Sequence, residues 1–376
     1  MSIANRISAE LKGDRVIWAI TALLALFSLL AVYSSSSTMA FKDKGSNTEF
    51  YLIKQLVLLG VGLLTTYVCY LIHYKRYSKL APYFLATVVP LLLLTLLVGP
   101  KINDAQRWLI VPGIGFTIQT SDLAKIALIM YVARSITSKQ DYIADFTGAF
   151  VPIILPIILV CILIAPADLS TALVIFVTCL LMMFIGRVAM KYILLLMFCG
   201  VVAFAGLIVI GDAYPGIVRT DTWKERLRSY RTDSEGSPQT QLAKMAIARG
   251  GFIGTGPGNS LQKNYLPMAY TDYIYAIILE EYGLIGGFFI LALYIILYFR
   301  VVRLVTKSPK TFPAMLAIGL VLILTIQALA NMSVSVHLVP VSGLPLPMVS
   351  MGGTSLLFSC TALGMILSVS KFIEDE

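Results

Sequence analysis

Charged residues are scarce in this chain: 13% of its 376 residues are Asp, Glu, Lys or Arg, whereas 58% are hydrophobic. Soluble domains are nearer half apolar and a quarter charged, so the composition favours a membrane protein over a soluble enzyme. The strict alternation of apolar and polar residues that a transmembrane barrel needs is also missing, for example in ILPIILVCILIA at 154–165. The sequence therefore predicts transmembrane helices.

Histidine is almost absent, with two residues, and the five cysteines all lie inside apolar stretches. No C-x-x-C spacing occurs, so a zinc site is not indicated and we interpret the cysteines as small buried hydrophobic residues. The net charge of +9 would suit a nucleic acid only as a basic face on a water-accessible domain, which the sequence does not indicate. We therefore expect no nucleic-acid partner.

Long apolar runs dominate the chain instead. A helix needs about 20 apolar residues to cross a hydrocarbon core about 30 Å thick. The runs predict an all-α integral membrane protein of about ten transmembrane helices, forming one polytopic domain over residues 1–376. The predicted helices are 16–35, 50–72, 79–99, 118–136, 148–166, 168–186, 188–211, 272–300, 311–333 and 352–371.

The distribution of Lys and Arg predicts the orientation of these helices. Basic residues such as Lys75, Arg76, Arg300 and Arg303 gather in alternate loops, whereas the short loops between them hold few. Basic loops remain on the cytoplasmic side of a membrane. We therefore predict that both termini are cytoplasmic, with one large extracytoplasmic loop at about 212–271 between helices 7 and 8.

Most of the remaining polar residues fall in loops of the predicted outer side. They include NDAQRW at 103–108 and PADLST at 166–171, besides the large loop and the loop before the last helix. A transporter would more naturally place polar residues around a midplane site, in broken helices of two matching halves, and the sequence shows no convincing internal repeat. The pattern favours a site at the outer membrane surface.

Five glycines lie close together in the large loop: Gly250, Gly251, Gly254, Gly256 and Gly258. Glycine lets the backbone approach a ligand closely and lets N–H groups point at phosphate oxygens. The stretch does not have the GxxxxGK[ST] pattern of a Walker loop. The alternative is that these glycines only form a tight turn at the membrane surface.

A carboxylate, Asp272, follows the glycines at the predicted start of the eighth helix, after the polar residues Ser260, Gln262 and Lys263. Asp272 or Thr271 could serve as the N-cap of this helix. Alternatively, Asp272 is a general base, because a carboxylate at an apolar boundary near helix N–H groups and cations can stay ionised and accept a proton. The residues alone leave both interpretations open.

Four charged residues fall within or at the ends of predicted helices: Lys125, Asp168, Glu280 and Glu281. Such charges cost several kcal/mol in a membrane unless they are paired or face water, so they indicate functional sites by default. The alternative is that they form structural ion pairs between helices.

These blocks, in this order, resemble the SEDS family of shape, elongation, division and sporulation proteins over about residues 100–355. The division branch (FtsW) is closer than the elongation branch (RodA). The resemblance is carried by Arg107-Trp108, Gln119, Ser121, Asp122, Lys125, Asp168-Leu169, Thr171, the Gly250–Gly258 run, Ser260-Leu261-Gln262-Lys263, Leu266-Pro267, Thr271-Asp272, Glu280-Glu281, Pro340, Gly343-Leu344-Pro345-Leu346-Pro347, Ser350 and Gly352-Gly353.

The resemblance implies a peptidoglycan glycosyltransferase with Asp272 as its catalytic carboxylate. Such an enzyme polymerises lipid II, a disaccharide-peptide on undecaprenyl pyrophosphate, at the outer face of the bacterial cytoplasmic membrane, here for septal wall synthesis in cell division. The candidate substrate-binding residues are Arg107, Trp108, Lys125, Gly256, Gly258, Ser260, Gln262 and Lys263, supported by the buried charges Asp168, Glu280 and Glu281. The family pattern is altered at Gln106, Ser170, Met268 and Tyr270, which leaves Asp272 and the glycines in place.

The residues suit this chemistry. Displacing pyrophosphate from an anomeric carbon by a sugar hydroxyl needs a base, cations for the leaving group and an apolar path for the lipid tails. One well-placed carboxylate rather than two predicts inversion in a single displacement. A divalent cation, Mg²⁺ or Mn²⁺, is a candidate cofactor.

Two other functions are considered: a flippase or transporter for lipid II, and a non-catalytic scaffold of the wall-synthesis complex. The resemblance implies a class B penicillin-binding protein as transpeptidase partner, together with other division-complex membrane proteins. Because small residues let helices pack closely in membranes, we predict docking surfaces at Gly286-Gly287 and at Ala328 and Ala330.

Overall fold

The structure is a computed structural model of the chain. It describes residues 12–35, 48–100, 106–110, 117–213, 223–226, 230, 238–266 and 270–374. Two parts of the sequence predictions lie outside these residues. They are Met268, where the family pattern is altered, and much of the first half of the large loop at 212–271.

The chain divides into two compact units, which are described separately. One unit comprises Met1–His73, Ser229–Lys307 and Leu324–Glu376, and the other comprises Tyr74–Arg228 and Ser308–Ile323. We call them unit 1 and unit 2. The apolar runs of the sequence gave no sign of this division.

Unit 1 is built from helices that are far apart in the sequence. They are α2 (Arg15–Ser35), α4 (Thr48–Leu71), α11 (Pro238–Gly250), the short η3 (Gln262–Asn264), α12 (Ile274–Val305), the later part of α13 (Thr311–Ser335) and α14 (Thr354–Glu374). Unit 2 contains α5 (Tyr74–Val98), β1 (Trp108–Ile110), β2 (Thr117–Gln119), α6 (Thr120–Ser138), η1 (Gln140–Tyr142), η2 (Phe146–Phe150), α7 (Val151–Ile164), α8 (Leu169–Ile185), α9 (Met190–Ala213) and the start of α13.

Each of the ten apolar segments predicted from the sequence coincides with helix in the structure, so the all-α membrane class is confirmed. Among the described residues, seven helices are long and apolar enough to cross a membrane: α2, α4, α5, the run from η2 through α7, α12, α13 and α14. Helix α8 and the first part of α9 are shorter apolar helices. The number of crossings and their orientation stay predictions.

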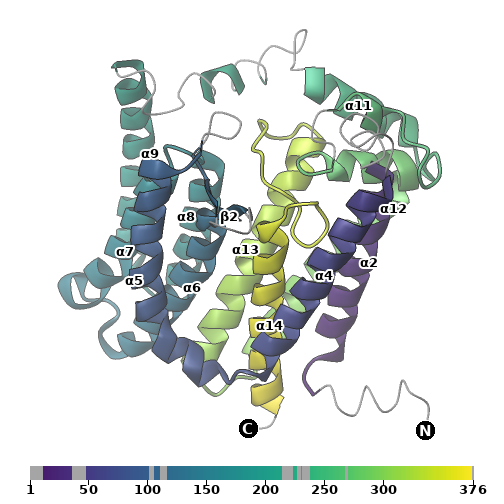
Figure 1. Cartoon of the computed structure of the whole chain (residues 1–376). Helices are drawn as coiled ribbons and strands as arrows, with labels where there is room; N and C mark the ends of the chain where they lie inside the picture. Colours follow the sequence, from purple (N-terminus) through teal and green to yellow (C-terminus); the bar gives the residue numbers. More distant parts are fainter. Residues whose placement is uncertain are drawn as a thin grey trace, which may run out of the picture. The chain divides into compact units, whose positions relative to one another are not determined.

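Small residues bring α4 and α14 together in unit 1, where they run side by side (Figure 1). A Cβ added at Gly62 would lie 2.7 Å from Cys360 Sγ, and one at Gly364 would lie 2.5 Å from the Thr66 carbonyl oxygen. Thr66 Oγ1 donates across the interface to the Cys360 carbonyl at 3.0 Å. Such close backbone contact with a polar cross-link is typical of helix packing in lipid.

The start of α2 and the last turns of α12 and α14 meet at one end of unit 1. Asp14 caps α2 by accepting from Val16 N at 2.8 Å, forms an ion pair with Arg300 of α12, and its own N–H donates to Ser370 Oγ of α14 at 2.7 Å. The first and last described helices therefore begin and end at the same end of the unit, as the predicted orientation requires.

In unit 2, α7 and α8 are separated by a turn at 165–168, which the sequence marks only by Pro166-Ala167-Asp168. Asp168 is the N-cap of α8, and its side chain accepts from Thr171 N at 3.1 Å. This capping bond satisfies one of the N–H groups that a helix start leaves unpaired.

Three features differ from the sequence predictions. Helix α11 in the large loop and the antiparallel hairpin β1–β2 before α6 were not predicted from the sequence. The predicted docking surface is wrong at Gly286, Gly287 and Ala328, because all three residues are buried within unit 1. A Cβ added at Gly287 would overlap the Leu279 side chain of the same helix, because it would lie 2.4 Å from a Leu279 carbon. The glycine therefore leaves room for the Leu279 side chain.

Candidate active site

Asp272 lies in the turn that precedes α12. The helix begins at Ile274, and its N-cap is Tyr273, which makes no side-chain capping bond. The interpretation of Asp272 or Thr271 as the N-cap is therefore wrong. Capping does not account for Asp272, whose side chain is half-buried.

The loop that connects α13 to α14, residues 336–353, borders Asp272. Ser350 Oγ donates to the Thr271 carbonyl at 2.7 Å. A Cβ added at Gly343 would lie 3.8 Å from Asp272 Oδ2, and Gly343 has φ +71°, a left-handed conformation that favours glycine. The backbone of Gly343 thus flanks the carboxylate without placing a side chain beside it.

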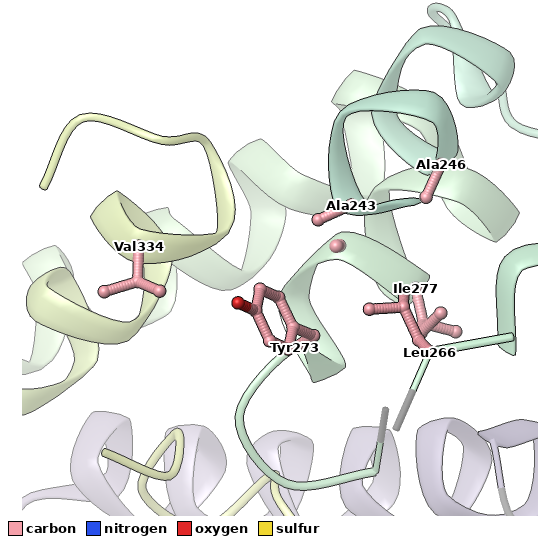
Figure 2. Packing of buried hydrophobic residues seen from close by; sticks show 7 residues of the cluster. Ala243, Ala246, Leu266, Tyr273, Ile277 and Val334 are labelled. Atoms are coloured by element: carbon pink, nitrogen blue, oxygen red, sulfur yellow. The ribbon is translucent and has the colours of Figure 1, made fainter. Parts of the chain in front are cut away.

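A hydrophobic cluster holds the residue after Asp272 in place (Figure 2). Figure 2 shows the Tyr273 ring between Val334 of α13 and the residues of α11. Tyr273 is 2% exposed, so its position is determined by packing. The buried members of the cluster are Ala243, Ala246, Leu266, Tyr273, Ala276, Ile277 and Val334.

The glycine-rich turn packs on a break in α12. Gly283 interrupts the helix with φ +66° and ψ −168°. Next to this break, Thr255 N donates to the Glu280 carbonyl and Gly256 N donates to the Glu281 carbonyl, both at 3.0 Å. These two N–H groups therefore bind α12.

Two glycines of this turn offer a test of that packing. Gly254 (φ +92°) and Gly251 (φ +53°) are both left-handed, but a Cβ on Gly254 would overlap the Glu281 carbonyl, whereas one on Gly251 meets nothing described within 4 Å. We expect Gly254→Ala to lower the free energy of unfolding by about 1–3 kcal/mol more than Gly251→Ala, because overpacking adds to the shared backbone strain. Thermal unfolding of the two purified variants in the same detergent measures the difference. Equal stability would show that the turn does not pack on α12 as described.

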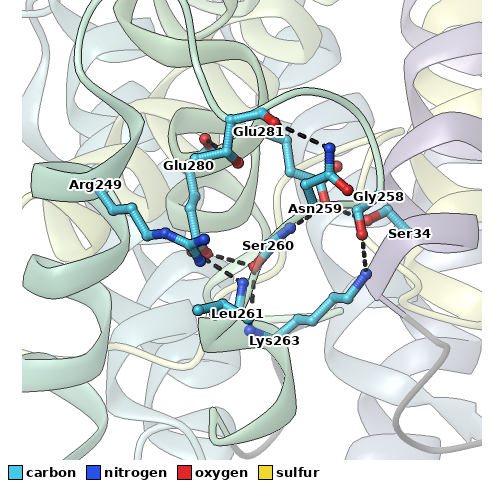
Figure 3. Close-up of polar contacts among 10 residues, drawn as sticks. Ser34, Arg249, Gly258, Asn259, Ser260, Leu261, Lys263, Glu280 and Glu281 are labelled. Atoms are coloured by element: carbon cyan, nitrogen blue, oxygen red, sulfur yellow. Dashed lines mark hydrogen bonds and ion pairs between the residues drawn. The ribbon is translucent and has the colours of Figure 1, made fainter.

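Glu280 ties three elements of unit 1 together (Figure 3). Its carboxylate is fully buried and accepts from the Ser260 hydroxyl, from Leu261 N at 3.0 Å and from Arg249 Nη1 at 3.1 Å. Arg249 ends α11, while Ser260 and Leu261 follow the glycines. A buried carboxylate requires such donors and a cation, so Glu280 joins α11 and the 255–263 segment to α12.

Glu281 and Lys263 continue this network (Figure 3). Glu281 Oε1 accepts from the Ser34 hydroxyl of α2 and from Ser260 N at 3.3 Å. The half-buried Lys263 donates through Nζ to the Gly258 carbonyl at 2.8 Å, and its N–H donates to Ser260 Oγ at 3.2 Å. The Lys263 ammonium therefore lies at the glycine-rich turn.

In unit 2, Arg107 and Asp168 form an ion pair of 3.1 Å between Nη1 and Oδ2. Arg107 Nε also donates to the Ala167 carbonyl at 2.8 Å. Both charged residues line a small pocket with Gln106, Ser121 and several apolar side chains of α5 and α7. The pocket thus combines an ion pair with an apolar wall.

Lys125 pairs with Asp122 within α6, at 2.7 Å, and both side chains are buried. Asp122 Oδ2 has no hydrogen-bond partner among the described residues. Just before the helix, Gln119 Nε2 donates to Ser121 Oγ at 3.1 Å, and Gln119 is paired in register with Trp108 of the hairpin. The hairpin therefore places Trp108 beside the start of α6.

The structure arranges the predicted site residues in two groups, one in each unit. Unit 1 holds Gly256, Gly258, Ser260, Gln262, Lys263, Asp272, Glu280 and Glu281, and unit 2 holds Arg107, Trp108, Lys125 and Asp168. Of the buried charges, Lys125, Asp168 and Glu280 are each in an ion pair, although that of Lys125 lies within one helix. The roles of all these residues in binding and catalysis stay predictions.

Three residues that contact predicted site residues were not predicted from the sequence: Arg249, Ser34 and Asn331. Two adjacent carboxylates in an apolar helix require a nearby cation, which was the available signal for a residue such as Arg249. The donors Ser34 and Asn331 come from other helices and carry no local signal. Among the described residues, no three His, Cys, Asp or Glu side chains gather in a way that could hold a metal ion.

The fold and site define a helical membrane protein with an acidic residue just before a helix, a glycine-rich turn packed on a break in the same helix, and buried ion pairs. The family model "Cell cycle protein" (FTSW_RODA_SPOVE) matches residues 14–375, and the chain belongs to this family. This match confirms the resemblance to the SEDS family that the sequence motifs indicated.

Relatives of the division branch match nearly the whole chain. "Probable peptidoglycan glycosyltransferase FtsW" of Trichlorobacter lovleyi is 35% identical over 363 residues, which cover 95% of this chain and 93% of the relative. The protein of the same name in Geobacter metallireducens is 36% identical over 365 residues, covering 95% and 94%. These names favour the division branch over the elongation branch.

The fold is also that of a solved structure. A chain described under "Structural coordination of polymerization and crosslinking by a peptidoglycan synthase complex" superposes with a TM-score of 0.78 at 24% identity, covering 97% of this chain and 99% of that one. At this identity the likeness establishes the fold alone.

Proposed function

We propose that this protein is a peptidoglycan glycosyltransferase that polymerises lipid II at the outer face of the bacterial cytoplasmic membrane, at the division septum. Two relatives that match it over 95% of its length carry that enzyme name. The single observation that carries the proposal is the half-buried Asp272 carboxylate, which does not cap α12 and is flanked by the backbone of Gly343.

In the proposed reaction, Asp272 accepts the proton of an acceptor sugar hydroxyl as the hydroxyl oxygen attacks the anomeric carbon of the donor. The new carbon–oxygen bond forms as the bond from the anomeric carbon to the pyrophosphate oxygen breaks. Undecaprenyl pyrophosphate leaves with the electron pair. One displacement inverts the configuration at the anomeric carbon.

Cations stabilise the charge that develops on the leaving group. We assign this role to Lys263, whose ammonium lies at the glycine-rich turn of unit 1. Mg²⁺ is commonly held by one or two carboxylates together with substrate phosphates, so a Mg²⁺ or Mn²⁺ ion would be held by Asp272 and the substrate. When bound, the ion supplies charge neutralisation.

Replacement of Lys263 by Ala should raise the KM for lipid II by about 10-fold or more, since a hydrogen bond to a charged group contributes about 1.5–3 kcal/mol. Lys263→Arg should recover only part of the loss, because a guanidinium presents its donors in a different geometry. Initial rates over a range of lipid II concentrations give the KM. The control is Lys244→Ala on α11, which removes the same charge from an exposed position. An unchanged KM in Lys263→Ala would contradict the assignment.

The proposed function is tested with purified protein and lipid II in detergent, followed by separation of glycan products on a gel. Detergent micelles have no second leaflet, so a flippase or a scaffold yields no product in this assay. Glycan strands that depend on the protein support the enzyme. Their absence with correctly folded protein would overturn it.

A polymerase of glycan strands requires a separate transpeptidase to cross-link its product. We propose a class B penicillin-binding protein as that partner, together with other membrane proteins of the division complex. The structural neighbour comes from a peptidoglycan synthase complex that coordinates polymerization and crosslinking, which supports this assignment.

A further inference from the structure

Two buried amides lie one turn apart on α13. Gln327 is 4% exposed and Asn331 is 1% exposed. Gln327 Nε2 donates to the Pro345 carbonyl at 2.9 Å. Asn331 Nδ2 donates to two carbonyls, that of Leu344 at 2.7 Å and that of Asp272 at 3.0 Å. Both amides donate to the loop before α14, and Asn331 also donates to the Asp272 backbone.

The orientation of the Asn331 amide follows from its neighbours. Carbonyl oxygens only accept hydrogen bonds, so the NH₂ group must face Leu344 and Asp272. The other end, Asn331 Oδ1, is buried without a hydrogen-bond partner among the described residues. A buried polar atom left in this way is unfavourable, so the two bonds of the donor end are the evident reason for an asparagine here.

Asn331 is one of three donors to the same turn. The Tyr270 carbonyl accepts from Met351 N at 3.0 Å, and the Thr271 carbonyl accepts from Ser350 Oγ at 2.7 Å. The Asp272 carbonyl accepts from Asn331. Three successive carbonyls are therefore held by α13 and the loop before α14.

This bracing matters because Asp272 precedes the helix. The N-cap of α12 is Tyr273, so the peptide groups of 270–272 lie outside the regular bonding of the helix. Their position depends on tertiary bonds instead. A displacement of about 1 Å in a reacting group can lower a rate about 10²-fold.

We propose that Asn331 is a positioning residue for Asp272: it joins the Asp272 peptide to the Leu344 peptide and thereby fixes where the carboxylate lies. This inference rests on the proposed function of Asp272. It assigns to the loop before α14 a part in setting the active-site geometry, in addition to α12.

The test compares Asn331→Leu with the matched control Gln327→Leu, which removes an equally buried amide one turn away. Asn331→Leu should lower kcat for lipid II polymerisation by about 10–100-fold with little change in KM. Gln327→Leu, which leaves the bond from Asn331 to the Asp272 carbonyl in place, should lower kcat much less than Asn331→Leu does. A second variant, Asn331→Asp, keeps the size of the side chain and should also lower kcat, because it removes the NH₂ donor.

Hydrogen exchange provides a readout that does not depend on activity. Asn331→Leu should increase deuterium uptake in a peptide covering 270–273 and leave a peptide covering 255–263 unchanged. Wild-type kcat in Asn331→Leu, while Asp272→Asn is inactive, would overturn the positioning role and leave the proposed function standing. If the wild-type protein makes no glycan, the proposed function fails. Unchanged deuterium uptake at 270–273 in Asn331→Leu would separately show that Asn331 does not hold this turn.

Discussion

Replacement of Asp272 by Asn should abolish lipid II polymerisation while the protein still inserts and folds. The amide has nearly the size of the carboxylate but cannot accept the hydroxyl proton, and the loss of general-base catalysis lowers rates by about 10²–10⁴-fold. The N-cap of α12 is Tyr273, and the Asn side chain keeps an acceptor oxygen in place of the carboxylate. The measurement is the initial rate of glycan formation by purified protein in detergent.

Stability is the control for this result. Thermal unfolding of Asp272→Asn should stay close to that of the wild-type protein, because the amide has nearly the size of the carboxylate, keeps an acceptor oxygen, and leaves the bond from Asn331 to the Asp272 carbonyl in place. An inactive variant with an unchanged unfolding temperature supports the general base. Near-normal glycan synthesis by Asp272→Asn would show that the base is another residue.

The helices could be predicted from the sequence because long apolar runs decide them locally. Helix α11 could not, since its sequence PQTQLAKMAIARG mixes polar and apolar residues without a long apolar run and lies in a polar loop. Its buried residues Ala243 and Ala246 pack in a cluster with the start of α12, and this contact is visible only in the fold. Helix stability in proteins comes mostly from such packing.

The site residues were recognisable as motifs, but their partners were not. Glu280 lies 31 residues from Arg249, and the Asp272 carbonyl lies 59 residues from its donor Asn331. Nothing local in the sequence specifies such pairs. The N-cap interpretation of Asp272 failed for a related reason: residue type permits capping at Thr271 or Asp272, whereas the packing of Tyr273 decides where α12 begins.

Loss of the Glu280 carboxylate should have the largest effect on stability among the substitutions considered. Glu280→Ala leaves the buried Ser260 hydroxyl and the Leu261 N–H without their acceptor, at a cost of about 1–3 kcal/mol for each donor that stays unpaired. It also removes the side-chain bonds that join Ser260 and Leu261 to α12, so polymerisation should fall with stability. Thermal unfolding and glycan synthesis are measured on the same preparation.

Glu280→Gln is the matched variant that separates hydrogen bonding from charge. Its amide oxygen can still accept from Leu261 N or Ser260, whereas the ion pair with Arg249 is lost. The Arg249 side chain is 37% exposed, and water weakens the contribution of a pair with an exposed partner. Glu280→Gln should therefore be clearly more stable than Glu280→Ala. If Glu280→Gln proved as destabilising as Glu280→Ala, the ion pair and not the acceptor role of Glu280 would hold this part of unit 1 together.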